Sequence, residues 1–509
     1  MKSLVMAAAE SAPFSSKSGL GEVVGKLCCE HARTGIETTC IIPFFTGKQG
    51  RDSFLAHHQL QAMDLSLEIP LGSKTMTGKV WETTLAESGV RYLLIDQPAF
   101  FQRPDLYQEE GQDYRDNCER FTFFSRAVLE TIRQLDLNPD IIHAHDWPTG
   151  LVPALLDIEY ASLPGFSHTR SCFTVHDMSY KGVFWHWDMV LTGLDWKHFN
   201  WKQMEFFGNL SLLKTGLVFG DLLTADSPTY AQEIQTAEQG NGLQGVLRSR
   251  RQVLRGILNG LDPADWSPET DRTLFQNYGA EDVASGKAAN KAAFQHEFGL
   301  PVSRDAFLVG VVGPFHRRSG GELLYGLLER SRETDTQFVL LGGSEGECKV
   351  TSPIGERTDR AVVVRGELSD VSYRRLLASA DAQVLLHRSQ PCGFPAMAAG
   401  AYGTIPIGQR VGGIADTVCD AVCDGLPPGR IAGFVFHFPD VPNLVTALDR
   451  AREQFRSTEH WQRLRQHAMR QRWDWSRTAE IYHEMYQQAL GETAPMSAPI
   501  VQFSASIQA

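Results

Sequence analysis

Residues 4–45, LVMAAAESAPFSSKSGLGEVVGKLCCEHARTGIETTCIIPFF, carry the pattern that decides the fold. The short apolar run 4–8 suits a buried parallel strand, and the Ser- and Gly-rich stretch 15–21 suits a loop. Apolar residues then recur at helical spacing over 20–31, before a β-rich run over 36–45. This order predicts a βαβ unit whose loop lies at the carboxyl end of the first strand, where open α/β sheets bind ligands.

The rest of the chain repeats this alternation of apolar runs and helical stretches. Strands are predicted over 140–143, 171–175, 222–225, 306–312, 337–341, 361–364, 382–386 and 405–408. We therefore expect an α/β protein with two doubly wound domains. The expected parts are a first domain over 1–265, a second over 266–475, a helix over 476–491 that returns to the first domain, and a loose tail over 492–509.

Composition favours a globular protein of ordinary solubility. The 509 residues are 42% hydrophobic and 21% charged, and a formal net charge of -12 argues against a nucleic-acid surface. An anionic substrate would therefore need a local basic site. The chain has no signal-peptide pattern and no apolar stretch long enough to span a membrane. Its nine cysteines are scattered without metal-ligand spacing, so we expect free thiols in a reduced cytoplasm and no metal.

A series of short motifs follows the predicted strands in a fixed order. They cover residues 9–14, 103–107, 113–121, 140–147, 174–177, 227–231, 259–262, 391–394 and 412–418. In order and spacing they resemble the bacterial glycogen synthases and plant starch synthases over nearly the whole chain. The resemblance implies a GT-B fold, in which two Rossmann-like domains face each other across a cleft. It also implies transfer of glucose from ADP-glucose to the non-reducing end of an α-1,4-glucan, without a metal or cofactor.

The resemblance assigns roles to polar residues of these motifs. His145, close to the end of a predicted strand, matches the histidine that holds the transferred glucose. Asp116 and Asn117 match residues near the donor glucose, and Glu10 and Asn259 match polar positions of the cleft. Helix capping and loop hydrogen bonds are the alternative roles of the last four.

The family's cleft also includes Gln390, Cys392 and Gly393, and we expect His145 to face Gln390 across it. The glycine pair 412–413 opens a predicted helix, where backbone N–H groups can approach a diphosphate. A tight turn alone would also explain these glycines.

The first departure from the family lies in the loop before residue 20. The family has Lys-x-Gly-Gly-Leu there, and its lysine reaches the donor's phosphates. In this chain Ser16 takes the place of that lysine, Lys17 comes one residue late, and Ser18 precedes the retained Gly19. Lys17 and Gly19 are therefore the donor-binding residues expected in this loop.

The second departure removes two cations. The family's second domain begins with Ser-Arg-x-x-x-Gln-Lys-Gly, whose arginine and lysine stabilise charge on the departing diphosphate. Pro314 and Ser319 occupy those two positions here. Arg317 and Arg318 lie close by in sequence and are either substitutes or solvated surface residues.

A third departure is Gln390, which replaces a glutamate and so removes a negative charge near the transferred glucose. Three interpretations follow. The protein is a glucosyltransferase of the glycogen synthase type with a weakened or altered donor site, or a non-catalytic relative that binds glucan or regulates a true synthase. The third interpretation is a GT-B enzyme for another acceptor, which no motif supports.

Overall fold

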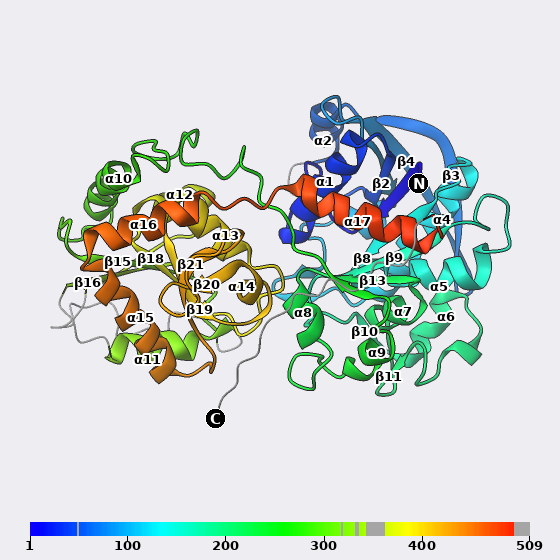
Figure 1. The fold of residues 1–509 in the computed structure, drawn as a ribbon. Helices are drawn as coiled ribbons and strands as arrows, with labels where there is room; N and C mark the ends of the chain where they lie inside the picture. Colours follow the sequence, from blue (N-terminus) through cyan, green and yellow to red (C-terminus); the bar gives the residue numbers. More distant parts are fainter. Residues whose placement is uncertain (48–49, 317–318, 331–334, 343–361, 493–509) are drawn as a thin grey trace. The chain divides into compact units, whose positions relative to one another are not determined.

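The computed structural model describes residues 1–47, 50–316, 319–330, 335–342 and 362–492. Within them the chain forms two compact units, each built on its own sheet (Figure 1). Unit 1 holds residues 1–225, 234–257 and the described residues from Ser476 on. Unit 2 holds residues 226–233 and 258–475, so the chain passes between the units more than once.

The sheet of unit 1 has nine strands, in the order β14-β13-β9-β8-β1-β2-β5-β4-β3. Neighbours from β14 to β5 pair in parallel, whereas β5, β4 and β3 pair antiparallel at one edge. The strands are β14 (Leu254–Gly256), β13 (Leu222–Ala225), β9 (Arg170–Val175), β8 (Ile141–His145), β1 (Ser3–Ala7), β2 (Glu37–Pro43), β5 (Arg91–Asp96), β4 (Lys74–Thr84) and β3 (Gln61–Leu71).

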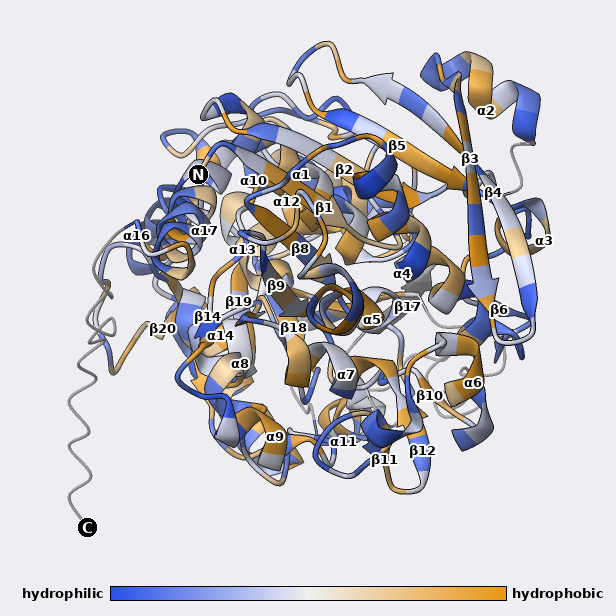
Figure 2. Cartoon of the chain, turned by 90° about the vertical axis from the view of Figure 1, so that its right-hand side faces the viewer, coloured by the Kyte–Doolittle hydropathy of each residue, from blue (hydrophilic) through white to orange (hydrophobic). Residues whose placement is uncertain are grey.

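The hydropathy pattern of each strand explains whether it lies in the centre or at the edge of this sheet. The parallel strands β1, β8 and β9 are buried almost along their whole length, as expected for a sheet covered on both faces. The edge strand β3 alternates between exposed and buried residues, as expected for a strand with one wet face. Figure 2 shows the difference, with apolar colour along β5 and mixed colour along β3.

Helices cover this sheet, and a small second sheet extends the unit. The helices are α1 (Gly19–Arg33), α2 (Arg51–His58), α3 (Pro98–Phe101), α4 (Asn117–Gln134), α5 (Leu151–Leu155), α6 (Met189–Thr192), α7 (Leu212–Phe219), α9 (Gln244–Ser249) and α17 (Trp475–Ala489). The second sheet has the order β10-β12-β11, with β10 (Val183–Phe184), β12 (Asn209–Ser211) and β11 (Glu205–Phe206). The short strands β6 (Gln108–Glu109) and β7 (Gln112–Asp113) form a separate hairpin.

Unit 2 contains a seven-stranded sheet, in the order β17-β16-β15-β18-β19-β21-β20, with parallel pairing throughout. Its strands are β17 (Val362–Gly366), β16 (Thr336–Leu341), β15 (Phe307–Val312), β18 (Ala382–Leu385), β19 (Ile405–Gln409), β21 (Ile431–Phe436) and β20 (Val418–Asp420). Its helices are α8 (Pro228–Glu233), α10 (Val283–Glu297), α11 (Gly321–Arg330), α12 (Asp370–Ser379), α13 (Phe394–Ala401), α14 (Gly412–Thr417), α15 (Val441–Phe455) and α16 (Thr458–Met469). The prediction of two doubly wound α/β domains is confirmed.

The last helix, α17, belongs to unit 1 although its sequence follows unit 2. It lies beside α1 in Figure 1, and the Tyr486 hydroxyl lies 2.7 Å from Nδ1 of His143 on β8. The ring of Tyr486 also contacts that of His31 on α1. The C-terminal helix is therefore part of the packing behind the central strands of unit 1. None of the helices in the described residues is long and apolar enough to cross a membrane.

His31 on α1 is a buried residue of this packing that lowers the stability of the folded protein. Neither ring nitrogen has a hydrogen-bond partner among the described residues, and burial lowers the pKa of His31 from 6.5 to about 3. The unfolded chain therefore binds a proton that the folded protein excludes. His31 consequently favours unfolding as the pH falls below about 6.5.

We expect His31→Leu to stabilise the protein by about 1 kcal/mol at pH 7, because it removes an unsatisfied buried polar group. The advantage should grow by roughly 2 kcal/mol between pH 7 and pH 5. Urea unfolding at the two pH values measures both effects, with the exposed His57→Leu as the control. An advantage that does not change with pH would contradict this account of His31.

Candidate functional site

Two histidines on β8 form the polar centre of unit 1. His143 and His145 are two residues apart, so both side chains lie on one face of the strand, with ring centroids 4.1 Å apart. His143 is fully engaged, since its Nε2 lies 2.6 Å from the Thr174 hydroxyl and its Nδ1 contacts Tyr486. His145, the last residue of β8, has no exposed surface.

His145 has one free nitrogen. Its Nδ1 lies 3.1 Å from Nε2 of His176, which follows β9, whereas its own Nε2 is buried without a partner in the described protein. A buried polar atom without a hydrogen bond calls for an explanation, and a ligand or a water that completes the bond is one. Among the predicted site residues of unit 1, His145 is the one with such an atom.

The environment keeps His145 neutral. Burial, and then the neighbouring rings of His143 and His176, hold its pKa well below the usual 6.5. A neutral imidazole has one N–H, so the contact with His176 decides which nitrogen of His145 carries it. If Nε2 of His176 donates to Nδ1, the free Nε2 of His145 is an N–H donor for a hydroxyl. In the other tautomer it is an acceptor.

Glu10 organises the loop before α1 rather than pointing a free carboxylate outward. The buried carboxylate accepts hydrogen bonds from the backbone N–H groups of Lys17 and Ser18, the Ser18 hydroxyl and the Tyr107 hydroxyl, at 2.5–2.9 Å. The ammonium of Lys17 lies 2.7 Å from a carboxylate oxygen of Asp105, with the side chain about half exposed. A Cβ on Gly19 would meet no atom within 4 Å. The loop is open at Gly19, and its lysine is held by an ion pair.

Asp116 and Asn117 both have structural partners at the start of α4. Asp116 is the N-cap residue and forms a two-pronged ion pair with Arg103, with one N–O distance of 2.8 Å. Burial alone would raise the pKa of Asp116, but the hydrogen bond from Arg103 outweighs it and lowers the pKa. The Asn117 amide donates to the Tyr107 carbonyl at 2.9 Å and accepts from Arg120 at 2.6 Å. These contacts explain both residues without a ligand.

The two glycine-containing motifs of unit 2 pack directly on each other. Gly413 donates its N–H to the Gln390 carbonyl at 2.7 Å. A Cβ on Gly413 would lie 2.1 Å from the backbone of Cys392, and one on Gly393 would lie 2.6 Å from that of Gly413. Backbone packing therefore requires glycine at 393 and 413. Burial raises the pKa of the Cys392 thiol to about 12, so this side chain is a neutral group.

The N–H of Gly412 already faces an anion from the same unit. It lies 3.1 Å from each carboxylate oxygen of Glu233, the last residue of α8. Burial, as the largest influence, raises the pKa of Glu233. A diphosphate at this turn would have to displace or adjoin Glu233. No sequence pattern indicates this contact, because the two residues are separated by 179 positions.

Asn259 is a buried polar residue of unit 2 beside the Cys392 thiol, whose pKa it lowers against the larger opposing effect of burial. It is buried, and neither its side-chain oxygen nor its side-chain nitrogen has a hydrogen-bond partner in the described protein. Asn259 thus shares with His145 the feature that suggests a missing ligand. Both residues were candidates from the sequence.

The loop after β15 contains Pro314 and Ser319, the two residues that the sequence motif predicts to stand in place of cations. The Ser319 hydroxyl is 3.0 Å from Nδ1 of His316, so it is engaged within the loop. Arg317 and Arg318 lie outside the described residues. A cation that sequence analysis missed, Arg388, forms an ion pair with Glu322 at the start of α11. The next-but-one residue is Gln390, so motif spacing could have drawn attention to Arg388.

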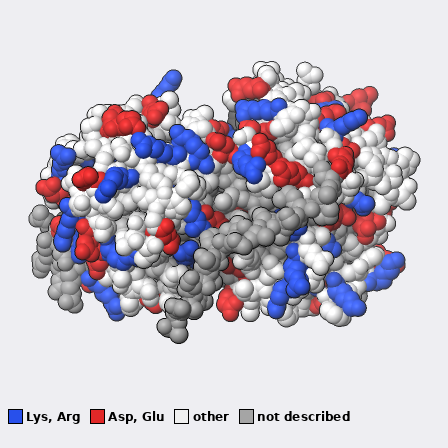
Figure 3. Space-filling view, viewed as in Figure 1, with Lys and Arg blue, Asp and Glu red and all other residues white. Residues whose placement is uncertain are grey.

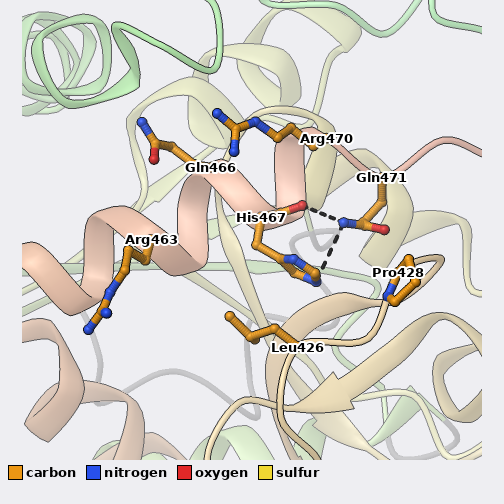
Figure 4. A pocket seen from close by; sticks show the side chains of 7 residues that line it. All are labelled: Leu426, Pro428, Arg463, Gln466, His467, Arg470 and Gln471. Carbon is orange, nitrogen blue, oxygen red and sulfur yellow. Dashed lines mark hydrogen bonds between the residues drawn. The ribbon is translucent and has the colours of Figure 1, made fainter.

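Two surface hollows lie away from all these residues. One, of about 390 Å³, is lined by Leu426, Pro428 and residues at the end of α16 and just after it, and Figure 4 shows Arg463 and Arg470 extending in different directions there. The other, of about 510 Å³, lies in unit 1 and is lined by residues that include Asp157, Asp221 and Arg250. On the face in Figure 3, basic and acidic side chains are intermixed. Neither hollow contains a predicted site residue.

Comparisons with known proteins identify the family of this chain. The model of the starch synthase catalytic domain matches residues 3–249, and that of the group 1 glycosyl transferases matches residues 295–469. The chain is 34% identical to glycogen synthase 2 of Geobacter sulfurreducens, covering 96% of this chain and 98% of the relative. It is 37% identical to a glycogen synthase of an Anaeromyxobacter species, covering 95% and 98%. The chain belongs to the family of bacterial glycogen synthases and plant starch synthases.

Solved structures agree with this assignment. The catalytic domain of starch synthase IV from Arabidopsis thaliana, bound to ADP and acarbose, matches with a TM-score of 0.84 and 31% identity, covering 96% of this chain and 99% of that one. The sucrose-phosphate synthase of Thermosynechococcus elongatus shares the fold, with a TM-score of 0.57 and 16% identity. The family and the GT-B fold expected from the sequence motifs are confirmed.

Proposed function

We propose that this protein extends an α-1,4-glucan by transferring glucose from a nucleotide sugar. The observation that carries the proposal is the full-length relationship to glycogen synthases together with the buried, unpartnered Nε2 of His145. We propose ADP-glucose as the donor, and the ADP-bound starch synthase IV supports that choice. His145 and Asn259 would complete their hydrogen bonds with the bound sugar or nucleotide.

In this proposal His145 acts as a neutral hydrogen-bonding group and not as a charged acid. Its low pKa keeps it neutral at physiological pH, and His176 fixes its tautomer. Such a group can hold a sugar hydroxyl in place while the glycosidic bond forms. Gln390 would contribute an amide in place of a carboxylate, so the site would carry less negative charge near the transferred glucose.

In this proposal fewer side-chain cations would contact the donor's diphosphate than the family motif implies. Pro314 has no side-chain donor, and Ser319 offers a neutral hydroxyl that already contacts His316. The candidate cations are Lys17, Arg388, Arg317 and Arg318, the last two of which lie outside the described residues. Lys17 and Arg388 are each paired with a carboxylate, so binding a phosphate would require a change of partner.

A second candidate function is a non-catalytic family member that binds glucan or regulates a true synthase. The observation that favours it is the engagement of the donor-facing groups by the protein's own carboxylates. Glu10 takes the N–H groups of the first loop, and Glu233 takes the N–H of Gly412. In this case the glucan would still bind, but nucleotide sugar would not.

Incorporation of radiolabelled glucose into glycogen tests the proposal. We expect incorporation from ADP-glucose that exceeds incorporation from UDP-glucose, at a rate below that of the Geobacter sulfurreducens glycogen synthase assayed alongside. No incorporation from either donor, with glycogen still bound, would support the non-catalytic function instead.

A further inference from the structure

An exposed group of tryptophans lies in unit 1, outside the residues assigned above. Trp185, Trp187 and Trp196 expose 61%, 53% and 42% of their surface. Successive ring contacts join them, with centroids 6.4 Å apart for Trp185 and Trp187 and 5.5 Å apart for Trp187 and Trp196. Phe199 extends the group at 5.6 Å from Trp196. We call these four residues the tryptophan patch.

Buried side chains and hydrogen bonds anchor the segment that carries the patch. Trp185 follows β10 directly, Met189 and Leu194 are buried beneath the segment, and the Asp195 carboxylate accepts the N–H of Lys197 at 2.8 Å. Arg126 on α4 donates to the Thr192 carbonyl at 2.9 Å. The rings are thus presented by an anchored segment, so binding would not have to order them first.

A contiguous group of exposed apolar rings is typical of a binding surface, whereas single exposed apolar residues are ordinary. A tryptophan combines an apolar face with an N–H donor at its edge. In the described part of the chain, the indole N–H groups of the three tryptophans donate to no protein acceptor. Apolar faces with free edge donors suit a pyranose, whose C–H face stacks on an aromatic ring while its hydroxyls accept at the edge.

The local charge and the ring geometry limit the class of ligand that the tryptophan patch can bind. Residues 183–203 contain two Asp and two Lys, a formal net charge of zero, which suits a neutral polymer and not a nucleic acid or an anionic lipid. The rings of Trp185 and Trp187 are inclined at 64°, and those of Trp187 and Trp196 at 74°. Flat polymers need coplanar rings, whereas an α-1,4-glucan coils and turns successive sugars relative to one another.

We propose that the tryptophan patch is a surface site for α-1,4-glucan that anchors the polymer by stacking on Trp185, Trp187 and Trp196. The choice of glucan over another neutral polymer rests on the proposed function. Such a site would raise the local concentration of glucan chain ends by holding other parts of the same polymer.

The test uses β-cyclodextrin, a closed ring of α-1,4-linked glucose that has no non-reducing end and so cannot accept glucose. Titration calorimetry of the full chain, without any nucleotide sugar, should detect binding. Trp185→Ala combined with Trp187→Ala should weaken binding about tenfold or more, since exposed tryptophans at binding surfaces carry much of the affinity. Phe438→Ala, which removes an aromatic residue of unit 2 with 68% exposure, should change the affinity less than twofold.

Trp185→Phe with Trp187→Phe should restore part of the affinity, and circular dichroism should show the same fold for every variant. The proposal would be overturned by absent binding, by equal binding in the alanine variant, or by a self-association of the unmodified protein that the alanine variant loses, because that would make the patch a protein interface. Binding that depends on the patch, in a protein that incorporates no glucose, would uphold this site and reject the proposed transferase activity.

Discussion

Replacing His145 with alanine is expected to lower the rate of glucosyl transfer by about 10²- to 10³-fold, the usual cost of losing one aligned hydrogen-bonding group at a reaction centre. The reason is its buried, unpartnered Nε2 at the end of β8, which a bound sugar hydroxyl could contact. The cost in stability should be ordinary for a buried side chain, about 1–3 kcal/mol. Initial rates at saturating donor and glycogen, with thermal unfolding of the same samples, measure both.

His143→Ala is the matched control. His143 is equally buried and its ring stacks on that of His145, but both its nitrogens are bonded, to Thr174 and Tyr486. Its removal should therefore cost at least as much stability as His145→Ala and less transfer rate. If the two variants lose rate in proportion to their loss of stability, His145 has a structural role alone.

Placing cations at positions 314 and 319, where the family motif is expected to carry them, should raise the transfer rate by a comparable factor. Pro314→Arg combined with Ser319→Lys adds two charge-assisted contacts to the donor's diphosphate, at roughly 1.5–3 kcal/mol each. Their sum corresponds to about 10²- to 10⁴-fold in transfer rate at limiting donor. Initial rates at low ADP-glucose concentration measure the gain.

A control must distinguish the effect of added net positive charge from the effect of positive charge at positions 314 and 319. Val302→Arg with Ser285→Lys introduces the same two residues at exposed positions elsewhere in unit 2 and serves as the control. We expect it to leave the rate within about twofold, because exposed charges are screened by solvent and salt. An equal gain in both double variants would mean that general attraction of the anionic donor limits the rate, and not the loop after β15.

The sequence predicted the sheets well because parallel strands are buried on both sides and read as apolar runs. The prediction placed His145 just after a strand, and β8 in fact extends to His145 as its last residue. The hydrogen bonds of Asp116 and Asn117, which sequence analysis offered as an alternative, are present at the start of α4. These features are local, so spacing and residue type suffice to find them.

Features that depend on distant contacts could not be predicted. The segment 226–233 lies in unit 2 although it is flanked by unit 1, and this brings Glu233 to the N–H of Gly412. Likewise, the engagement of Lys17 by Asp105 and of Arg388 by Glu322 follows from side-chain geometry that no motif encodes. Whether a cation is free to bind phosphate is thus a property of the folded chain.

Calorimetric titration with ADP tests most directly the claim that the glucan-extending frame is kept while the diphosphate is held by fewer cations. We predict weak binding of ADP to the unmodified protein and binding roughly 10²-fold or more tighter in the Pro314→Arg, Ser319→Lys variant. Tight ADP binding by the unmodified protein, unchanged by the double substitution, would contradict the account. It would identify other residues, with Lys17 and Arg388 first among those described, as a complete phosphate site.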